Sequence, residues 1–283
     1  MAEIIKGPLW PARNQSADAG AGSIHDDDTA QDLGFRGGTV AGDVHMNQFV
    51  PVLLKVFGNT WLEQGNLSLQ FRNPTIDREV VQVFVEPPEE SAKQCRVWME
   101  REDGLLVCEG TAAVGDHSQS VLRSRDLRGC DPSELKILNK LHPGLSLGTY
   151  EVTTDSAKQF ERFDAELISD PLSWYRSESG SPWGEIVAAP VTLIQYLYGF
   201  PVAALMPLVG ESVGLFGAIE IGFENGPFLF DRQYRVESEV VAVGQSPQTE
   251  FVWYDSVAYE GEKVIARMRM QSRAMKNSSP AYQ

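Results

Sequence analysis

The sequence is poor in the residues that build disulfide frameworks and metal sites. Its three cysteines, Cys95, Cys108 and Cys130, are odd in number and lack metal-type spacing, so neither a disulfide scaffold nor a zinc motif is expected. The four histidines are scattered through the first half of the chain and form no cluster with cysteine. We therefore expect no metal and a reducing compartment, which favours the cytoplasm.

Basic charge is also scarce. The chain carries 24 Lys and Arg against 39 Asp and Glu, a formal net charge of −15, which argues against nucleic acid as a partner. The first 20 residues contain no basic region followed by an apolar run, so no secretory signal is expected. Gly, Pro or polar groups interrupt the longer apolar runs, and we expect no membrane association.

What the chain does contain is one pattern of elements that occurs twice. Within 283 residues, of which 42% are hydrophobic, an apolar helical segment is followed by strands and turns, and the second half repeats this order. In the first half we expect a loop-like start, a helix over 43–58 kinked at Pro51, and strands over 67–71, 80–86, 95–101 and 105–114. In the second half we expect a helix over 190–208 and strands over 218–223, 235–243, 250–259 and 263–271.

This repetition predicts an α+β protein with two related units. The expected boundaries are residues 1–125 for the first unit and 150–283 for the second, joined by a linker over 126–149. Asp131-Pro132 begins a short helix inside that linker, because Asp is a good helix cap and Pro suits the first helical position.

Chemically, the most informative stretch runs from Ser23 to Gly42. Here His25 precedes an acidic cluster, a short helix capped by Asp27 or Asp28 and closed by Gly34 is expected, and a glycine-rich passage leads into the apolar segment. A titratable imidazole and a bare-backbone helix start are what chemistry on a carbonyl compound needs: a base or acid, and N–H groups for a developing oxyanion.

The same stretch resembles the signature of the MaoC-like dehydratases, the (R)-specific enoyl-CoA hydratases of the hotdog fold. Ile24-His25-Asp26-Asp27 matches the family's Ile-His-x-Asp, and Ala30, Gly34-Phe35 and Gly42 fall at matching positions. Two parts depart from the motif: Gly20-Ala21-Gly22-Ser23 replaces Asp-x-Asn-Pro, and the family's His-Gly-Met reads Ala41-Gly42-Asp43. The resemblance implies a tandem, double hotdog, in which each copy is an antiparallel sheet wrapped around a long central helix.

By resemblance, the first copy is the catalytic one. Asp18, seven residues before His25 across a glycine-containing loop, is the candidate for the missing aspartate. Asp18 and His25 would hold water and exchange protons, and the Gly42 N–H would serve the thioester oxygen. A histidine that only hydrogen-bonds within its turn, and a solvated Asp18, are the alternatives. The second copy has Ser173 where the family has histidine, so we expect it to be inactive and to supply the substrate pocket.

Several other residues are candidates for contact with the substrate. They are Asp27 beside the histidine, His45 and Asn47 one turn into the central helix, and Arg72 as a phosphate contact. The aromatic residues of the second copy (Trp174, Tyr175, Trp183, Tyr196 and Tyr198) belong to the core or interface, or line a wide pocket.

The function that these features predict is a hydratase or dehydratase of an enoyl or 3-hydroxyacyl thioester. The expected partner is an acyl-CoA or acyl-carrier substrate, no cofactor is implied, and association into a homo-oligomer stays open. One alternative is a hotdog enzyme with altered chemistry: a dehydratase, cyclase or thioesterase acting on a natural-product or degradation intermediate. The other alternative is a non-catalytic binding or assembly subunit.

Overall fold

A single antiparallel sheet of ten strands organises the protein. The computed structural model describes residues 3–14, 21–88, 92–168, 172–177 and 181–283. The strand order is β1-β3-β4-β5-β2-β7-β10-β9-β8-β6. The strands are β1 (Ile5–Pro11), β2 (Gly65–Phe71), β3 (Val80–Glu86), β4 (Gln94–Arg101), β5 (Leu106–Val114), β6 (Ser146–Thr153), β7 (Gly214–Phe223), β8 (Gln233–Gln245), β9 (Thr249–Glu260) and β10 (Lys263–Met275).

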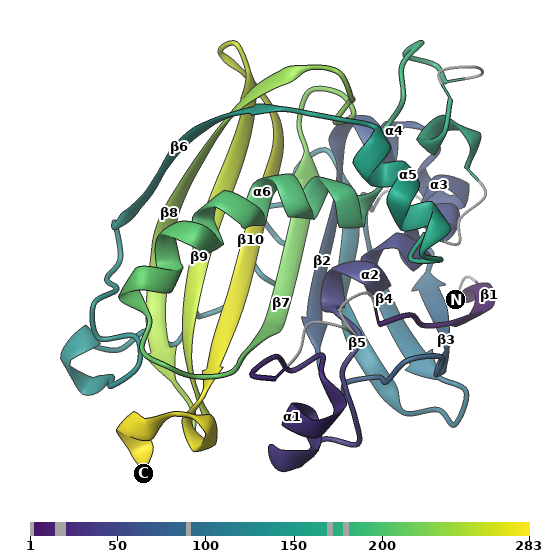
Figure 1. Cartoon of the computed structure of the whole chain (residues 1–283). Helices are drawn as coiled ribbons and strands as arrows, with labels where there is room; N and C mark the ends of the chain where they lie inside the picture. The colour runs from purple at the N-terminus through teal and green to yellow at the C-terminus, as the bar shows by residue number, and fades with distance from the viewer. Residues whose placement is uncertain (1–2, 15–20, 89–91, 169–171, 178–180) are drawn as a thin grey trace.

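The strand order makes the duplication visible. Reading from the two edges inward, β1-β3-β4-β5-β2 of the first half mirrors β6-β8-β9-β10-β7 of the second (Figure 1). The halves join where β2 pairs with β7, from Asn66–Gly222 to Gln70–Ala218. The predicted repeat is therefore confirmed as two sheets of matching topology fused into one.

The helices are α1 (Asp27–Asp32), α2 (Gly42–Met46), α3 (Val50–Phe57), α4 (Thr60–Gln64), α5 (Ala157–Asp164) and α6 (Pro190–Leu205). α2 and α6 lie against one face of the sheet, whereas α1 lies beyond the ends of the strands (Figure 1). Within the described residues, only the second half has one long helix, α6 of 16 residues, lying across the sheet (Figure 1). In the first half a 3-10 turn at Asn47–Phe49 separates α2 from α3, because Pro51 has no N–H to give to the carbonyl of Asn47. The prediction of one long central helix in each copy is thus wrong for the first.

Alternating side chains explain which face the helices cover. In β2, Leu67 and Leu69 are buried in the main core with the helices, and Ile219 and Ile221 of β7 do the same. The span Pro190–Leu208 is, contrary to expectation, long and apolar enough by length and composition to cross a membrane. Its packing on the sheet accounts for that apolar composition.

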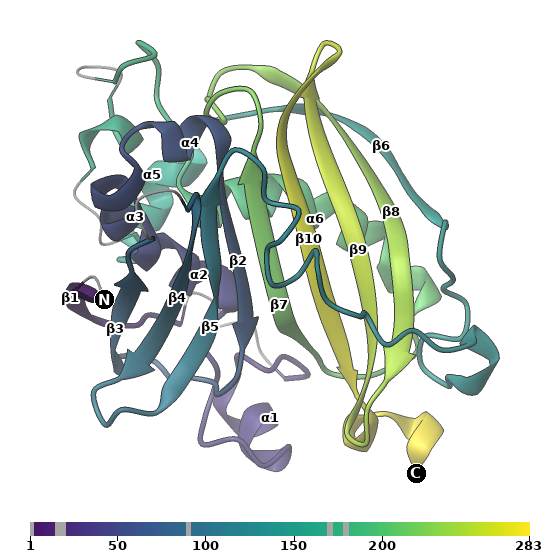
Figure 2. The same ribbon diagram turned by 180° about the vertical axis from the view of Figure 1, so that it is seen from behind.

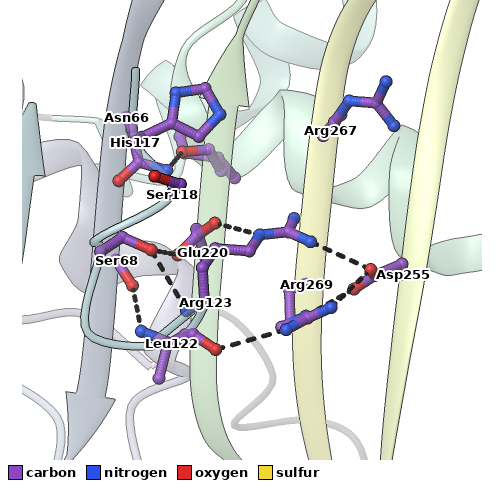
Figure 3. A network of polar contacts seen from close by, with 12 residues as sticks. Asn66, Ser68, His117, Ser118, Leu122, Arg123, Glu220, Asp255, Arg267 and Arg269 are labelled. Carbon is purple, nitrogen blue, oxygen red and sulfur yellow. Dashed lines mark hydrogen bonds and ion pairs between the residues drawn. The ribbon is translucent and has the colours of Figure 1, made fainter. Parts of the chain in front are cut away.

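The segment after β5 crosses the opposite face of the sheet and is fastened there by charged groups (Figures 2 and 3). Arg123 Nε lies 2.7 Å from Glu220 Oε1, and Arg123 Nη1 lies 3.0 Å from Asp255 Oδ2. Glu220 is only 1% exposed, on β7 beside the junction with β2. Arg269 holds Asp255 through two further hydrogen bonds of 2.8 Å. This network ties the two copies to the segment that connects them.

Local differences from the sequence-based expectation concern the chain start and the linker. Ile5–Pro11 is the strand β1 and not a loop, since an edge strand with a register shift tolerates its prolines. In the linker, Asp131 begins a 3-10 turn with a full capping box, and β6 starts at Ser146, inside the segment predicted as linker. The cap of α1 is Asp26, and not Asp27 or Asp28, whereas Gly34 closes this helix as predicted, with φ of 88°.

Candidate active site

A cavity of about 400 Å³ lies where the two copies meet. Residues of the loop before α1, the start of α2 and the end of β2 line it from the first copy. The second copy contributes α6, the start of β7 and the end of β10. Beyond the last β2–β7 pair, Gln70–Ala218, the residues that follow in β2 and precede in β7 become cavity walls. The cavity is thus built into the junction of the duplication.

His25 lines this cavity and is fixed by the backbone. Its Nδ1 lies 2.6 Å from the carbonyl oxygen of Thr39. A carbonyl only accepts hydrogen bonds, so in the neutral ring Nδ1 carries the proton and Nε2 keeps its lone pair. Among the described residues, no hydrogen bond to Nε2 is formed. The imidazole is therefore oriented with its basic nitrogen available to a molecule in the cavity.

The loop around His25 is held by its acidic neighbours. Asp26 caps α1 through the Thr29 N–H and hydroxyl, at 2.9 and 2.7 Å. Asp27 Oδ1 accepts the Gly38 N–H at 2.7 Å, and a side chain at Gly38 would collide with the His25 carbonyl, its Cβ lying 2.1 Å from that oxygen. The acidic cluster and the glycine passage thus position His25. The described cavity lining does not include Asp27.

Gly42 also lines the cavity, at the first position of α2. The N–H of a first helical residue has no partner within its helix and is left for another acceptor. A Cβ at Gly42 would lie 2.5 Å from two ring carbons of Phe71, so the ring packs directly against the glycine backbone. Only glycine fits this position while Phe71 stays in place.

The two polar residues predicted one turn into the central helix have different surroundings. His45 lines the cavity but is 2% exposed, and its Nε2 lies 2.8 Å from Thr75 Oγ1. Burial lowers the pKa of His45 to about 4, so this ring is neutral at pH 7. Asn47 is absent from the described lining: its Oδ1 accepts the Val191 N–H of α6 at 3.0 Å, and its amide donates to Leu167.

Arg72 lines the cavity from the end of β2, and its Nη2 lies 3.0 Å from Glu109 Oε1. Asp18 falls outside the described residues, and so does the serine-aspartate-proline segment 169–171 of the second copy. Of the predicted site residues, the structure therefore gathers His25, Gly42, His45 and Arg72 at one cavity.

Sequence reasoning missed two residues near this group and left a third undecided. Asp43 is fully buried, and its Oδ2 accepts a 2.8 Å hydrogen bond from Gln195 of α6. Burial raises the pKa of this carboxyl, while the Gln195 hydrogen bond and the Arg162 charge oppose the shift. Arg273 of β10 was not singled out and lines the cavity; a charge on a strand gives no sequence signal of facing a cavity. Tyr198 of α6 is the one aromatic residue of those proposed from the second copy that lines it.

Within the described ranges, no group of three or more His, Cys, Asp or Glu side chains could hold a metal ion. The chemistry available at the cavity is that of an oriented imidazole, a helix-start N–H with no partner among the residues described, a phenol and guanidinium groups.

No protein-family model matches the chain, and no curated protein matches its sequence. Solved structures do match its shape. A protein assigned as a MaoC domain dehydratase from Chloroflexus aurantiacus superposes with a TM-score of 0.62 at 11% identity, covering 96% of this chain and 95% of that one. A conserved hypothetical protein from Mycobacterium tuberculosis with a double hotdog fold gives 0.60 at 11% identity, over 96% and 95%. A protein assigned as an oleoyl thioesterase from Lactobacillus plantarum gives 0.50 at 9% identity, over 97% of each chain.

These likenesses extend over nearly the whole chain. The protein therefore has the double-hotdog fold found in MaoC-like dehydratases. The resemblance carried by the Ile24–Gly42 stretch is confirmed at the level of the fold.

Proposed function

We propose that this protein is a hydratase or dehydratase that acts on an enoyl or 3-hydroxyacyl thioester. The observation that carries the proposal is the placement of His25 and Gly42 at one cavity, with Nδ1 of the imidazole fixed by Thr39 and Nε2 without a partner among the described residues. The double-hotdog fold supports it, because MaoC-like dehydratases share that fold.

In the hydration direction, His25 Nε2 takes a proton from water as the water oxygen bonds to the β carbon. The electron pair of the carbon–carbon double bond then moves toward the thioester carbonyl, whose oxygen gains negative charge. The Gly42 N–H stabilises that oxygen by a hydrogen bond. The imidazolium returns its proton to the α carbon, and the double bond of the carbonyl re-forms. Dehydration follows the same steps in reverse.

The other predicted residues have supporting roles in this proposal. Asp18 would orient the water beside His25, and Asp27 holds the loop through Gly38. His45 contributes a neutral ring to the cavity wall, and Arg72 faces the incoming acyl-CoA or acyl-carrier arm. Asn47 acts at a distance, by fastening α2 to α6.

Thioester hydrolysis is a second candidate, because the fold is shared with the protein assigned as an oleoyl thioesterase. The same oriented imidazole could activate water for attack on the carbonyl carbon, with the thiolate as leaving group. The loss of the Asp-x-Asn-Pro segment also separates this chain from the hydratase motif.

The two reactions can be distinguished in one experiment with short, medium and aromatic enoyl-CoAs. Hydration removes the absorbance of the conjugated thioester without releasing thiol, whereas hydrolysis releases a thiol that a colorimetric reagent detects. Wild type, His25→Ala and Asp18→Asn are compared, with His142→Ala, an exposed histidine of the linker, as the matched control.

We expect wild type to hydrate at least one substrate and His25→Ala to lower the rate by about 10²- to 10⁴-fold, the usual contribution of a general acid–base group. His142→Ala should leave the rate unchanged. Thiol release that depends on His25 would favour the hydrolase. A wild type that is inert on the whole panel would count against both reactions and favour a binding subunit.

A further inference from the structure

Two guanidinium groups line the cavity, and the charge of a third acts on both, although the chain as a whole is strongly acidic. Arg72 follows β2 and Arg273 lies on β10, and both line the cavity. The third group is that of Arg125, in the segment that crosses the outer face: its charge and that of Arg72 oppose each other, and both act on Arg273. Burial and the positive charges of Arg125 and Arg72 all lower the pKa of Arg273. Like charges brought together in this way repel, so the cluster is costly unless an anion joins it.

The described part of the chain provides few negative charges to neutralise these arginines. Glu109 pairs with Arg72, but no carboxylate of the described residues forms an ion pair with Arg273 or Arg125. Arg273 Nε donates to the neutral Gln271 Oε1 at 3.0 Å, and the Arg125 guanidinium lies 5.4 Å from the Trp253 ring centroid.

Two neighbouring arginines, in contrast, do have acidic partners. Arg123 and Arg269 are half-buried near the same junction, and both are paired with Asp255 on the sheet (Figure 3). Arg123 and Arg269 thus have an acidic partner on the sheet, whereas Arg273, which lines the cavity, has none among the described residues.

The sheet is also shaped around Arg273. A Cβ at Gly217 of β7 would lie 2.3 Å from Arg273 Nε and 2.2 Å from Gln271 Oε1, so the bare glycine backbone provides the room for both side chains. The β7–β10 register shifts at this point, between Gln271 and Ser272. Gly217 also lies directly beyond Ala218, the last β7 residue paired with β2. Arg273 is therefore seated where the two copies separate and the cavity begins.

We propose that Arg273 and Arg72 form an anion-binding subsite of the cavity, which takes a phosphate or carboxylate group of the ligand. The fork of a guanidinium group matches two oxygens of either anion. The anion belongs to the thioester substrate, as either a phosphate of the carrier or a carboxylate on the acyl group. This last assignment rests on the proposed function, whereas anion binding itself does not.

Three saturated thioesters separate the two sources without requiring hydration. Butyryl-CoA carries phosphates only, succinyl-pantetheine carries a carboxylate only, and butyryl-pantetheine carries neither. Their dissociation constants are measured by calorimetry on wild type, Arg273→Gln and Gly217→Ala, which keeps the charge but displaces the guanidinium group. Arg267→Gln is the matched control, since this residue of the same strand pairs with Glu224 and does not line the cavity.

We expect Arg273→Gln to weaken one anionic ligand by about 10- to 100-fold, the equivalent of one charge-assisted hydrogen bond. Gly217→Ala should weaken the same ligand, and Arg267→Gln should not. Loss of butyryl-CoA binding identifies the carrier phosphate, and loss of succinyl-pantetheine binding identifies an acyl carboxylate. Arg273→Lys keeps a positive charge but not the two-pronged guanidinium group, so its affinity for the anionic ligand should lie between those of wild type and Arg273→Gln. This variant replaces Arg273→Gln in the test if the glutamine variant does not fold.

Equal affinities of wild type and Arg273→Gln for all three ligands would overturn the inference, as would an equal loss for the uncharged one. Either result leaves the hydratase proposal intact if enoyl-CoAs are still hydrated. Selective loss of an anionic ligand from a protein that is inert on enoyl-CoAs would instead retain the subsite and reject the proposed reaction.

Discussion

The contact between Gly42 and Phe71 allows a direct test of whether the position of the Gly42 N–H at the start of α2 determines activity. In Gly42→Ala the new Cβ would lie 2.5 Å from the Cε2 and Cζ atoms of Phe71. Carbon atoms in ordinary contact are about 3.5–4.0 Å apart, so the ring or the start of α2 must move by roughly 1 Å. Overpacking of this kind costs about 1–3 kcal/mol in the free energy of unfolding.

The catalytic effect should be larger than the structural one. Alanine keeps the backbone N–H, so the donor itself survives and only its position changes. A displacement of about 1 Å at a reacting centre can lower a rate by about 100-fold. We expect Gly42→Ala to lose that much activity in the enoyl-CoA hydration assay, while urea denaturation reports the modest loss of stability.

The Phe71→Leu substitution supplies the control, because leucine lacks the ring atoms that meet the new Cβ. In the double variant Gly42→Ala/Phe71→Leu, activity should return to the level of Phe71→Leu alone, and the four proteins form a double-mutant cycle. If Gly42→Ala is as active and stable as wild type, or if the double variant stays inactive, the ring contact does not position the N–H and this reasoning fails.

Two further predictions concern buried charge. Because burial raises the pKa of Asp43, its folded state takes up a proton more readily than the unfolded chain. The free energy of unfolding of wild type should therefore fall relative to that of Asp43→Asn as the pH rises from 3.8, the ordinary pKa of Asp, through the raised pKa. Urea denaturation midpoints of both proteins from pH 3.5 to 7 measure this difference. A wild type that gains stability relative to Asp43→Asn over this range would contradict the prediction. Arg123→Ala leaves Glu220 buried without its cation and should cost about 3–5 kcal/mol by urea denaturation. The exposed Arg36→Ala control at its Glu79 pair should cost at most about 1 kcal/mol, and equal losses would argue against the network.

Much of the fold could be predicted because strand alternation and turn chemistry are local properties. The prediction for β3 coincides with the observed strand, Val80–Glu86, and β7 to β10 were found with ends misplaced by a few residues. β1 was missed because its prolines signal a loop, and only pairing with β3 makes an edge strand of it. The first helix was predicted with a kink at Pro51 and is instead divided by the 3-10 turn Asn47–Phe49, because the sequence shows the proline but not how far its missing hydrogen bond disrupts the helix.

In the candidate site, too, the sequence predicts residues that belong to one local motif but not those that only long-range contacts bring to the cavity. His25 and Gly42 were found because one motif contains both. Arg273 could not be predicted, since its place at the cavity depends on the register shift at Gln271 and on the end of the β2–β7 pairing, which bring distant segments together. Asp43 could be placed in the first turn of its helix, but its burial against Gln195 depends on how α2 meets α6.

The two helix starts explain why the proposed chemistry has a place in only one copy. Gly42 at the start of α2 carries an N–H, whereas Pro190 at the start of α6 has none. The next N–H of α6, that of Val191, is already bound to Asn47 of the first copy. Ser173 stands where the motif would have histidine. The second copy thus contains no histidine, and its described residues leave no free N–H in the first turn of α6 for an oxyanion. Asn47, which occupies that helix start, fastens the two copies around the cavity that they share.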